Sequence, residues 1–458
     1  MKYFGTDGIR GVYPEKLSDE LAFRVGRSLT TKKYINVIVA RDTRVSGASI
    51  AKDLCYGLSL GGANITYVGI ASTPCLAFLC EKFCFDYGIM ITASHNPKQY
   101  NGIKIFNSVG EKLPYDEEKR LEKSIDKIVV DDIIKSNIQK LNLLETFNGQ
   151  EIHNLDERVN PRLISFKPKL VDYYIEEITQ EFRFKNKFKV GIDTANGGAS
   201  DLAEKIFKKV GVSCTVINKS LFEDINDNCG ALYPQKMRQL VVDKNLDIGI
   251  CLDGDADRLV VVQDDGTLLN GDDLIYLLSL YLKSKNRLAK NTVVLTILNN
   301  LALENELKEN DIKVVRCDVG DKNIYEEIKT KHYNFGGENC GHIIFGDKER
   351  SGDGIYCALK LLQMLDRLDA KISSLPKLKL KNEVSINYDC QDKNRLIKNQ
   401  SVLELKQKLE EQIKKDGRII LRASGTENKV RIMVEHSSLT KAKQVANKLL
   451  RELEKQDK

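Results

Sequence analysis

The sequence lacks the features that would assign it to several specialised classes of protein. No apolar run approaches the ~18 residues that a membrane-spanning helix needs. The 11 cysteines are odd in number and form no CxxC pair, which indicates neither a disulfide framework nor a zinc ribbon. The first residues carry no signal-peptide pattern. We therefore expect a cytoplasmic protein that does not associate with membranes.

A strong charge of one sign is also missing. The 71 basic and 65 acidic residues leave a formal net charge of +6, which is too diffuse for a nucleic-acid-binding surface but suits small anionic substrates. Apolar residues make up 42% of the chain, an ordinary share for a globular protein. A chain of 458 residues exceeds what one core supports, so several domains are expected.

Apolar runs that predict strands alternate with amphipathic stretches that predict helices. Strands are expected at 36–40, 64–70, 87–91, 189–193, 213–217, 248–252, 292–298 and 312–315, with helices from Ser49, at 199–210 and after Asn300. This alternation indicates α/β units with largely parallel sheets. Near the C-terminus, strands at 418–421 and 430–434 precede a helix with apolar residues at helical spacing from Ala442 to Leu453.

The predicted fold class is α/β, with three α/β mixed-sheet domains of similar topology and a C-terminal α+β domain. Polar stretches near 148–150 and 373–376 are the expected linkers. A further join near residue 258 rests on the restart of the strand-helix alternation. The expected domains are therefore 1–150, 151–258, 259–372 and 373–458.

The sequence TASHNP (92–97) directly follows the apolar run at 87–91. Ser94 therefore lies where a predicted strand gives way to a loop. Pro97 pushes the preceding residue out of the helical region, so the loop is extended or turning. A hydroxyl in such a loop, beside His95, is well placed to carry a transferred group. A plain Ser/Asn-rich turn is the alternative interpretation.

Three carboxylates alternate with other residues in DGDADR (253–258). They are Asp253, Asp255 and Asp257. At this spacing they repel one another unless a cation lies among them, and oxygen ligands without histidine or thiol favour Mg²⁺. An EF-hand calcium loop is excluded, because Arg258 stands where glycine is needed. The strand at 248–252 places the triplet at a strand's carboxyl end, where α/β proteins bind ligands. The alternative is a solvated acidic turn.

Two further motifs suit a phosphorylated sugar. In GGENCGH (336–342), paired glycines allow close approach of the backbone, and Glu338 can accept hydrogen bonds from vicinal hydroxyls. In RASGTE (422–427), followed by Arg431, hydroxyls, amides and two guanidinium groups can surround a phosphate. A glycine-bracketed turn and a Ser-Gly hairpin turn are the respective alternatives.

Taken together and in this order, the motifs closely resemble the α-D-phosphohexomutase superfamily, whose N-terminal motif is matched by GTDGIRG (5–11). The resemblance spans residues 4 to about 435. Within the superfamily, the sequence looks most like the bacterial phosphoglucosamine mutases. Four segments support that subgroup. They are the opening KYFGTDGIRG (2–11), DTANGG (193–198), CGALYP (229–234) and the His-Ile-Ile (342–344) at the end of GGENCGH, the motif that we call the sugar loop.

The resemblance implies a heart-shaped, four-domain enzyme with a central cleft, to which each domain contributes one loop. Ser94 would be the phosphoserine, and Ser94, Asp253, Asp255 and Asp257 would bind one Mg²⁺ per chain. Arg10, His95 and Lys104 would surround the serine phosphate, with Lys104 and His342 as general acid/base groups. Asp193 and Arg258 would be supporting residues. Glu338 and Cys340 would contact the sugar, and Arg422, Ser424, Gly425, Thr426 and Arg431 would bind the non-reacting phosphate.

The implied reaction interconverts glucosamine 6-phosphate and glucosamine 1-phosphate through a sugar 1,6-bisphosphate that also activates the enzyme. Its product would feed UDP-N-acetylglucosamine and cell-wall synthesis. The substrate would be the only partner expected, in a monomer or homodimer.

Asn339 and Cys340 replace the glutamine and serine usual in this subgroup, and Asn428 replaces a common proline. A thiol donates more weakly than a hydroxyl, so a phosphomannomutase/phosphoglucomutase acting on a neutral hexose is the alternative. A non-catalytic phosphosugar-binding protein is a second one, which the complete Ser94 loop and Asp triplet disfavour.

Overall fold

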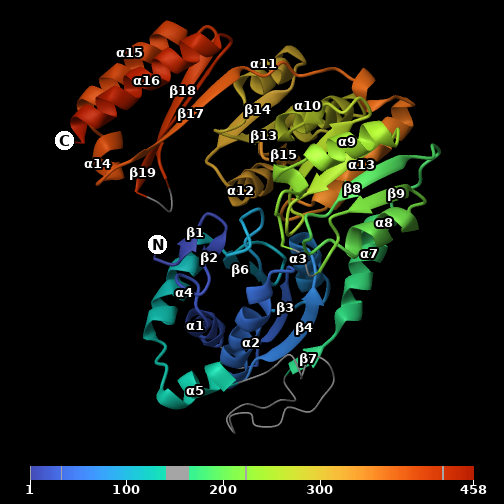
Figure 1. Cartoon of the computed structure of the whole chain (residues 1–458), viewed down its shortest axis with the longest axis vertical. Helices are drawn as coiled ribbons and strands as arrows, with labels where there is room; N and C mark the ends of the chain where they lie inside the picture. The colour runs from blue at the N-terminus through green and yellow to red at the C-terminus, as the bar shows by residue number, and fades with distance from the viewer. Residues whose placement is uncertain (1, 32–33, 141–163, 222–223, 425–427, 458) are drawn as a thin grey trace.

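The computed structural model describes residues 2–31, 34–140, 164–221, 224–424 and 428–457 of the chain, and Figure 1 shows how they are arranged. Four sheets follow one another along the sequence, each with its own helices, so we describe four units. The first three contain mixed sheets and the fourth is antiparallel. The predicted fold class is thereby confirmed.

The first unit, blue to teal in Figure 1 except for the green β7, contains a seven-stranded sheet in the order β1-β2-β6-β5-β3-β4-β7. Its strands are β1 (Phe4–Gly5), β2 (Gly8–Val12), β3 (Asn36–Arg41), β4 (Asn64–Ile70), β5 (Tyr87–Ile91), β6 (Tyr100–Asn107) and β7 (Ile164–Phe166). Its helices are α1 (Asp19–Leu29), α2 (Val45–Leu60), α3 (Thr73–Lys82), α4 (Tyr115–Lys127) and α5 (Asp132–Lys140). Strand β3 is parallel to β4 and β5, whereas β6 is antiparallel to β5 and β2.

The second unit contains a five-stranded sheet in the order β12-β11-β10-β8-β9. Its strands are β8 (Lys189–Asp193), β9 (Ser213–Ile217), β10 (Ile248–Leu252), β11 (Leu259–Gln263) and β12 (Leu268–Leu269). Its helical segments are η2 (Pro168–Leu170), α7 (Val171–Thr179), α8 (Leu202–Lys209), η3 (Gly230–Leu232) and α9 (Gln235–Asp243). The central strand β10 is buried at every position, as its unbroken apolar sequence predicts.

The third unit contains a four-stranded sheet in the order β14-β13-β15-β16. Its strands are β13 (Thr292–Thr296), β14 (Lys313–Cys317), β15 (Phe335–Gly337) and β16 (Ile343–Phe345). Its helical segments are α10 (Gly271–Ser284), η4 (Ala289–Asn291), α11 (Leu301–Glu309), α12 (Asp321–Lys331), α13 (Gly354–Leu368) and η5 (Ile372–Ser374). Helix α10 begins with a capping box, in which Asn270 and Asp273 exchange side-chain and backbone hydrogen bonds.

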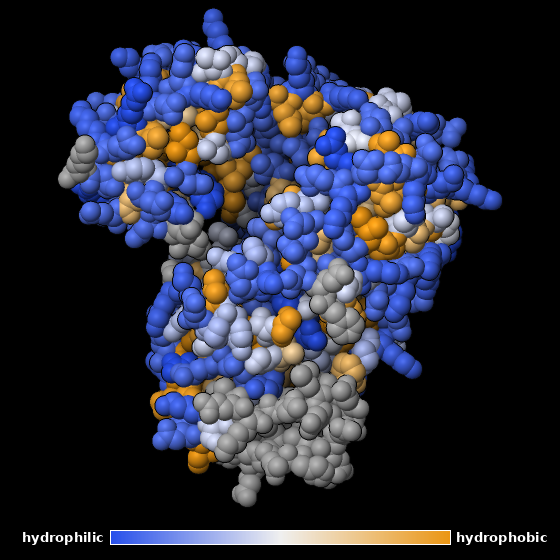
Figure 2. Space-filling view, viewed as in Figure 1, coloured by the Kyte–Doolittle hydropathy of each residue, from blue (hydrophilic) through white to orange (hydrophobic). Residues whose placement is uncertain are grey.

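The fourth unit, red in Figure 1, pairs β17 (Asn382–Asp389), β19 (Lys429–His436) and β18 (Gly417–Ala423) in that order. Its helices are α14 (Lys393–Ile397), α15 (Gln400–Ile413) and α16 (Leu439–Gln456). The helix predicted from the apolar spacing between Ala442 and Leu453 is confirmed as α16, whose buried face contains both residues. Figure 2 shows the molecular surface hollowed between this unit and the third unit.

Two of the sheets extend beyond the expected domain boundaries. The first sheet takes in β7, which lies beyond residue 150, and the second takes in β11 and β12, which lie beyond residue 258. A boundary at 258 would separate the paired strands β10 and β11. We therefore propose that the first join follows β7 and the second follows β12. The linker expected near 148–150 lies outside the described residues.

The buried residues divide the molecule differently from the sheets. One apolar cluster extends through the first three units, from Ile38 through Val190 and Leu252 to Ile372. The fourth unit has a cluster of its own, built from α15, α16 and the strands. Its junction with the third unit is polar: Glu435 accepts the amide of Leu301 at 3.0 Å, and Arg418 donates to the carbonyl of Asn299 at 2.5 Å. Among the described residues, no helix is long and apolar enough to cross a membrane.

Candidate active site

Ser94 lies in the loop between β5 and β6, at the carboxyl end of β5. Its backbone adopts a φ of 51°, a left-handed conformation that is uncommon for a residue with a side chain. Its Oγ donates to Oδ2 of Asp253 at 2.6 Å and lies 3.3 Å from Nδ1 of His95. Residues held in such conformations cluster at functional sites. The loop thus holds this hydroxyl against the second unit.

Arg44 holds the Ser94 loop in this conformation. Its guanidinium is buried and donates to four carbonyl oxygens of the loop region, those of Ser94, Asn96, Pro97 and Tyr100, at 2.6–2.9 Å. Its Nε donates to Asp42 at 3.0 Å. Asn226 of the second unit adds a further bond to the Ser94 carbonyl at 2.8 Å. Arg44 was not predicted from the sequence, although it lies four residues beyond a predicted strand.

The three aspartates of the second unit are buried together. Oxygen atoms of Asp253, Asp255 and Asp257 all lie within 4.8 Å of one another. Among the described residues, Oδ1 of Asp255 and Oδ1 of Asp257 have no hydrogen-bond partner. Burial and the charges of the other two carboxylates raise the pKa of Asp253 to about 8. The donor set therefore fits a divalent cation with oxygen ligands, which would neutralise this repulsion.

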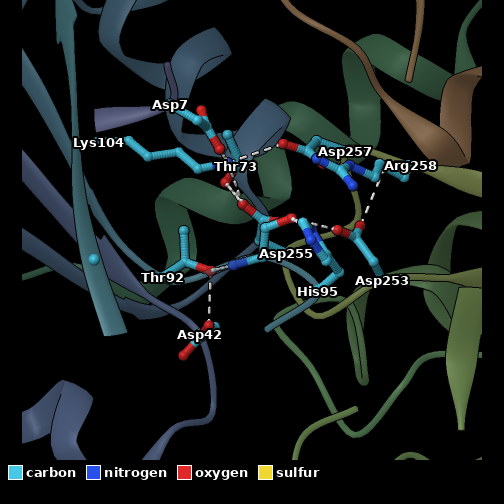
Figure 3. A network of polar contacts seen from close by, with 12 residues as sticks. Asp7, Asp42, Thr73, Thr92, His95, Lys104, Asp253, Asp255, Asp257 and Arg258 are labelled. Carbon is cyan, nitrogen blue, oxygen red and sulfur yellow. Dashed lines mark hydrogen bonds and ion pairs between the residues drawn. The ribbon is translucent and has the colours of Figure 1, made fainter. Parts of the chain in front are cut away.

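Lys104, on β6, supplies a positive charge to the triplet (Figure 3). Its Nζ lies 2.8 Å from Asp255 and 2.9 Å from Asp257. It also lies 3.0 Å from Asp7, and the side chain is 1% exposed. Burial opposes its charge, but the neighbouring carboxylates raise the pKa of Lys104 well above its usual value. The ammonium is therefore charged in the free protein, where it offsets the charges of Asp255 and Asp257.

Two further predicted residues lie around Ser94. Arg10 donates to Asp7 at 2.8 Å and to the Asn96 side chain at 3.3 Å. His95 is largely buried, and burial together with the charges of Arg258 and Arg10 lowers the pKa of His95 to about 3. His95 is thus neutral at pH 7 and able to donate or accept a hydrogen bond near Ser94.

His342, which precedes β16, approaches the triplet from the third unit. Its Nδ1 lies 3.7 Å from Asp257, and its Nε2 lies 3.3 Å from Asp321 and accepts the Gly352 amide at 2.8 Å. A Cβ on Gly352 would stand 2.5 Å from the imidazole ring, so only glycine allows this contact. The amide favours the neutral ring, whereas the carboxylates raise the pKa of His342 against the effect of burial. The ring nitrogen thus has a partner in either protonation state.

The sugar-loop residues lie at the end of β15. Glu338 is 8% exposed, and its Oε1 accepts the amide of Gly320 at 3.1 Å. The Cys340 thiol lies 3.8 Å from Oε2 of Glu338. Burial raises the pKa of the Glu338 carboxyl, and a ligand hydroxyl that donates to it would stabilise the charged form.

The expected phosphate-binding residues lie on the fourth unit. Arg422 on β18 stands directly opposite Arg431 on β19, an arrangement of like charges that destabilises a sheet unless an anion lies nearby. Burial and the charge of Arg431 lower the pKa of Arg422. Among the described residues, the buried Oγ of Ser424 has no hydrogen-bond partner. These groups fit an anion. Gly425 and Thr426 lie outside the described residues.

The structure thus brings most of the predicted residues into one network and leaves one group apart. Ser94, His95, Arg10, Lys104, the three aspartates and His342 are connected by the contacts above. Among the described residues, those contacts do not extend to Arg422 or Ser424. Asp193 and Arg258 support the loops: Asp193 accepts the amides of Ala195 and Gly230, and the Arg258 amide donates to Asp253.

Several residues of the network were not predicted from the sequence. They are Asp7, Arg44, Thr73, Lys112, Asn226 and Asp321. Thr73 at the start of α3 donates to Asp255 at 2.5 Å, and Lys112 joins Asp7 to Asp321. A sequence signal exists for Asp7, which lies in the GTDGIRG motif. The others act through partners far along the chain.

Sequence profiles of known families match four segments of the chain. All four profiles are described as phosphoglucomutase/phosphomannomutase: alpha/beta/alpha domain I matches residues 1–130, domain II 172–266, domain III 270–381 and the C-terminal domain 386–452.

Curated proteins of similar sequence extend over the whole chain. A phosphoglucosamine mutase from Thermoanaerobacter pseudethanolicus is 36% identical over 465 aligned residues, covering 99% of each chain. One from Campylobacter curvus is 38% identical over 463 aligned residues, covering 99% of this chain and 98% of its own.

Solved structures share the fold at low sequence identity. A phosphoglucomutase/phosphomannomutase family protein from Burkholderia thailandensis has a TM-score of 0.76 at 22% identity, covering 98% of this chain and 97% of its own. The N-acetylphosphoglucosamine mutase of Aspergillus fumigatus, in complex with GlcNAc-6P and magnesium, has a TM-score of 0.65 at 16% identity, covering 100% and 96%.

Proposed function

Because this chain belongs to the phosphoglucomutase/phosphomannomutase family, we propose that it is a phosphoglucosamine mutase. It interconverts glucosamine 6-phosphate and glucosamine 1-phosphate. The observation that carries this proposal is the Ser94 hydroxyl, held 2.6 Å from Asp253 at the meeting point of the first two units. Curated relatives that align over nearly the full chain favour glucosamine as the sugar.

Ser94 is the group that carries the phosphoryl between two half-reactions. Phosphorylated Ser94 gives its phosphoryl to O1 of glucosamine 6-phosphate, which yields the 1,6-bisphosphate. The 1,6-bisphosphate then reverses its orientation in the site. Its 6-phosphoryl group is transferred to Ser94, which leaves glucosamine 1-phosphate. Covalent storage on a serine divides one difficult transfer into two easier steps.

Asp253, Asp255, Asp257 and the Ser94 phosphate hold one Mg²⁺ in this proposal. When bound, the cation neutralises charge on the transferred phosphoryl group. The unpartnered carboxylate oxygens and the raised pKa of Asp253 support this assignment. Lys104, Arg10 and the neutral His95 orient the phosphoryl oxygens, because such transfers depend mainly on positioning and positive charge.

Lys104 and His342 are the proposed groups that exchange protons with the sugar hydroxyls. His342 has both a donor and an acceptor beside Nε2, which suits a group that gains and loses a proton. Glu338 and Cys340 contact the sugar hydroxyls. Arg422, Ser424 and Arg431, with Gly425 and Thr426, bind the phosphate that is not transferred.

The residues of the sugar loop are also compatible with a second candidate function, that of a phosphomannomutase/phosphoglucomutase acting on a neutral hexose. The thiol of Cys340 replaces a hydroxyl next to Glu338, which weakens one hydrogen-bond donor in the loop. In the glucosamine pathway, the product would serve UDP-N-acetylglucosamine and cell-wall synthesis in the cytoplasm.

A comparison of sugars tests the proposal. Purified protein with Mg²⁺ and glucose 1,6-bisphosphate should turn over glucosamine 6-phosphate with at least about tenfold higher kcat/KM than glucose or mannose 6-phosphate. A preference for mannose or glucose would establish the alternative instead.

Intact mass spectrometry supplies an independent check of the chemistry. Protein treated with glucose 1,6-bisphosphate should gain one phosphate, and an excess of glucosamine 6-phosphate should remove it. Protein that neither gains nor loses phosphate, and turns over none of the three sugars, would indicate the non-catalytic binding protein.

A further inference from the structure

Six ionisable side chains of the site form a closed ring in which acidic and basic residues alternate. The order is Asp257, Lys104, Asp7, Lys112, Asp321, His342 and back to Asp257. The five ring distances that involve Nζ or Nε2 atoms run from 2.5 to 3.3 Å, and the closing distance, from His342 Nδ1 to Asp257, is 3.7 Å. The ring passes through the first three units.

Lys112 stands opposite Asp257 in this ring and contacts none of the proposed metal ligands. It lies on the first unit after β6, and its side chain is 10% exposed. Its Nζ lies 2.5 Å from Asp7 and 2.7 Å from Asp321. Asp7 lies against Lys104, and Asp321 lies against His342. One ammonium is thus placed one residue away from each of the two proposed proton-transfer groups.

We propose that Lys112 is a positioning residue for catalysis, which fixes Asp7 against Lys104 and Asp321 against His342. This inference rests on the proposed mutase function. Lys112 itself does not reach the sugar or the phosphate in this proposal. It sets the orientation of two groups that come from different units, because it pairs with Asp7 of its own unit and with Asp321 of the third unit.

Two features argue that this arrangement is more than an ion pair between units. The same boundary carries a second such pair, Lys329 with Glu111 at 2.8 Å, whose lysine is 52% exposed and connects to no member of the ring. Lys112 is instead buried at a cost in desolvation, which an ion pair offsets only when its geometry is well defined. A buried lysine held by two carboxylates fixes both of them, whereas the exposed pair has little energetic effect.

The test compares Lys112→Met, which keeps the length of the side chain without its charge, with Lys329→Met as the matched control. We expect Lys112→Met to lower kcat about 30-fold or more, with KM for glucosamine 6-phosphate within about twofold, since misplaced catalytic groups slow the chemical step. Lys329→Met should leave both parameters unchanged. A kcat for Lys112→Met within about twofold of the control would overturn the inference.

The double variant Lys112→Met/Asp321→Asn separates positioning from folding stability. It removes the carboxylate that loses its lysine partner in the single variant, so the unfolding temperature should recover while kcat stays low. Recovery of kcat together with the unfolding temperature would mean that Lys112 is only structural. If Lys112→Met does not fold, Lys112→Arg decides: a lowered kcat at an unchanged unfolding temperature supports positioning, and parental kcat contradicts it.

The parent protein distinguishes failure of this inference from failure of the proposed function. A parent that turns over no hexose phosphate and gains no phosphate would remove the function itself. An active parent with a fully active, folded Lys112→Met variant would remove only the role of Lys112.

Discussion

Oγ of Ser94 lies 2.6 Å from Oδ2 of Asp253, a residue 159 positions later in the sequence. The contact joins the loop after β5 to the loop after β10, so the ends of two parallel-sheet strands from different units face each other. Ligand sites in α/β proteins form at such carboxyl ends. Here the facing loops combine a hydroxyl with three buried carboxylates.

Replacing Ser94 with alanine should abolish mutase turnover without unfolding the protein. The change removes the only oxygen proposed to hold the phosphoryl group between half-reactions. Turnover of glucosamine 6-phosphate and the intact mass after bisphosphate treatment measure the effect. Ser108→Ala, on the exposed turn after β6, is the control and should behave as the parent. Turnover of Ser94→Ala within about tenfold of the parent would remove Ser94 from the mechanism.

Asp255→Asn should weaken Mg²⁺ binding and lower kcat. One of three buried carboxylates loses its charge, so the cation is held less strongly. Titration of activity and of bound Mg²⁺ should give a higher half-saturating concentration. Asp265→Asn, on the exposed turn between β11 and β12, provides a control of the same chemistry. An unchanged Mg²⁺ titration in Asp255→Asn would mean that the triplet is a structural turn.

Arg422→Ala and Arg431→Ala should each lower kcat/KM, with a loss of about 1.5–3 kcal/mol of transition-state stabilisation, the range for a charge-assisted contact. Phosphorylation of Ser94 by glucose 1,6-bisphosphate should slow as well, since its second phosphate needs the same residues. Arg451→Ala, on the exposed face of α16, should have no effect. Parental kinetics in both Arg422→Ala and Arg431→Ala would mean that the second phosphate binds elsewhere.

Cys340→Ser should keep or improve activity on glucosamine 6-phosphate, because a hydroxyl of similar size donates more strongly toward Glu338. Burial, followed by the charge of Glu338, raises the pKa of the Cys340 thiol to about 12, although Arg258 opposes the shift. Alkylation at pH 8 should therefore be slower at Cys340 than at the exposed Cys84, and bound substrate should slow it further. Equal labelling of Cys340 with and without substrate, combined with an inactive Cys340→Ser variant, would contradict the proposal that Cys340 lies beside the bound sugar.

Asp53→Asn should change how stability depends on pH. Asp53 lies on α2 with 0% exposure, and among the described residues its carboxylate oxygens have no hydrogen-bond partner. Burial raises the pKa of Asp53 to about 8, although Lys52 at 3.5 Å opposes the shift. The folded state holds this proton more tightly than the unfolded chain, so the acid form adds stability at low pH. That stability is lost as pH rises from about 4, the unfolded value, to about 8.

Asparagine stays neutral throughout this range. The stability of Asp53→Asn relative to the parent should therefore increase with pH, by up to about 1 kcal/mol per pH unit. Unfolding midpoints at pH 5 and pH 8 measure the difference. Asp243→Asn, an exposed position on α9, should show no such trend. A constant difference between Asp53→Asn and the parent would mean that Asp53 is charged in the folded protein at both pH values.

Much of the fold could be predicted from the sequence, because unbroken apolar runs identify buried strands. The expected strands 64–70, 87–91, 189–193, 213–217 and 248–252 coincide with β4, β5, β8, β9 and β10. Helix starts were predicted less well. Helix α2 begins at Val45 rather than Ser49, and α8 at Leu202 rather than Ala199. Neither has a side-chain cap that the sequence would have revealed.

Some residues of the candidate site could likewise be predicted from the sequence, and others could not. Motif residues at strand ends, such as Ser94 and Asp255, could be identified because loop position and residue chemistry point to the same role. Arg44, Lys112 and Asp321 could not, since their roles depend on partners that only the packing of units brings near. Arg44, for example, donates to carbonyls 50 to 56 positions away. No local pattern carries that information.

The separate apolar core of the fourth unit has a consequence for heating. A unit with its own core, joined to the rest through polar contacts such as Arg418–Asn299 and Glu435–Leu301, is expected to melt independently. Calorimetry of the free protein should then record two transitions. A bisphosphate that contacts Ser94 at one end and Arg422 at the other would stabilise only the assembled form, so rising ligand concentration should merge the two transitions into one. The cooperativity of unfolding would thus report on whether a single ligand spans both parts.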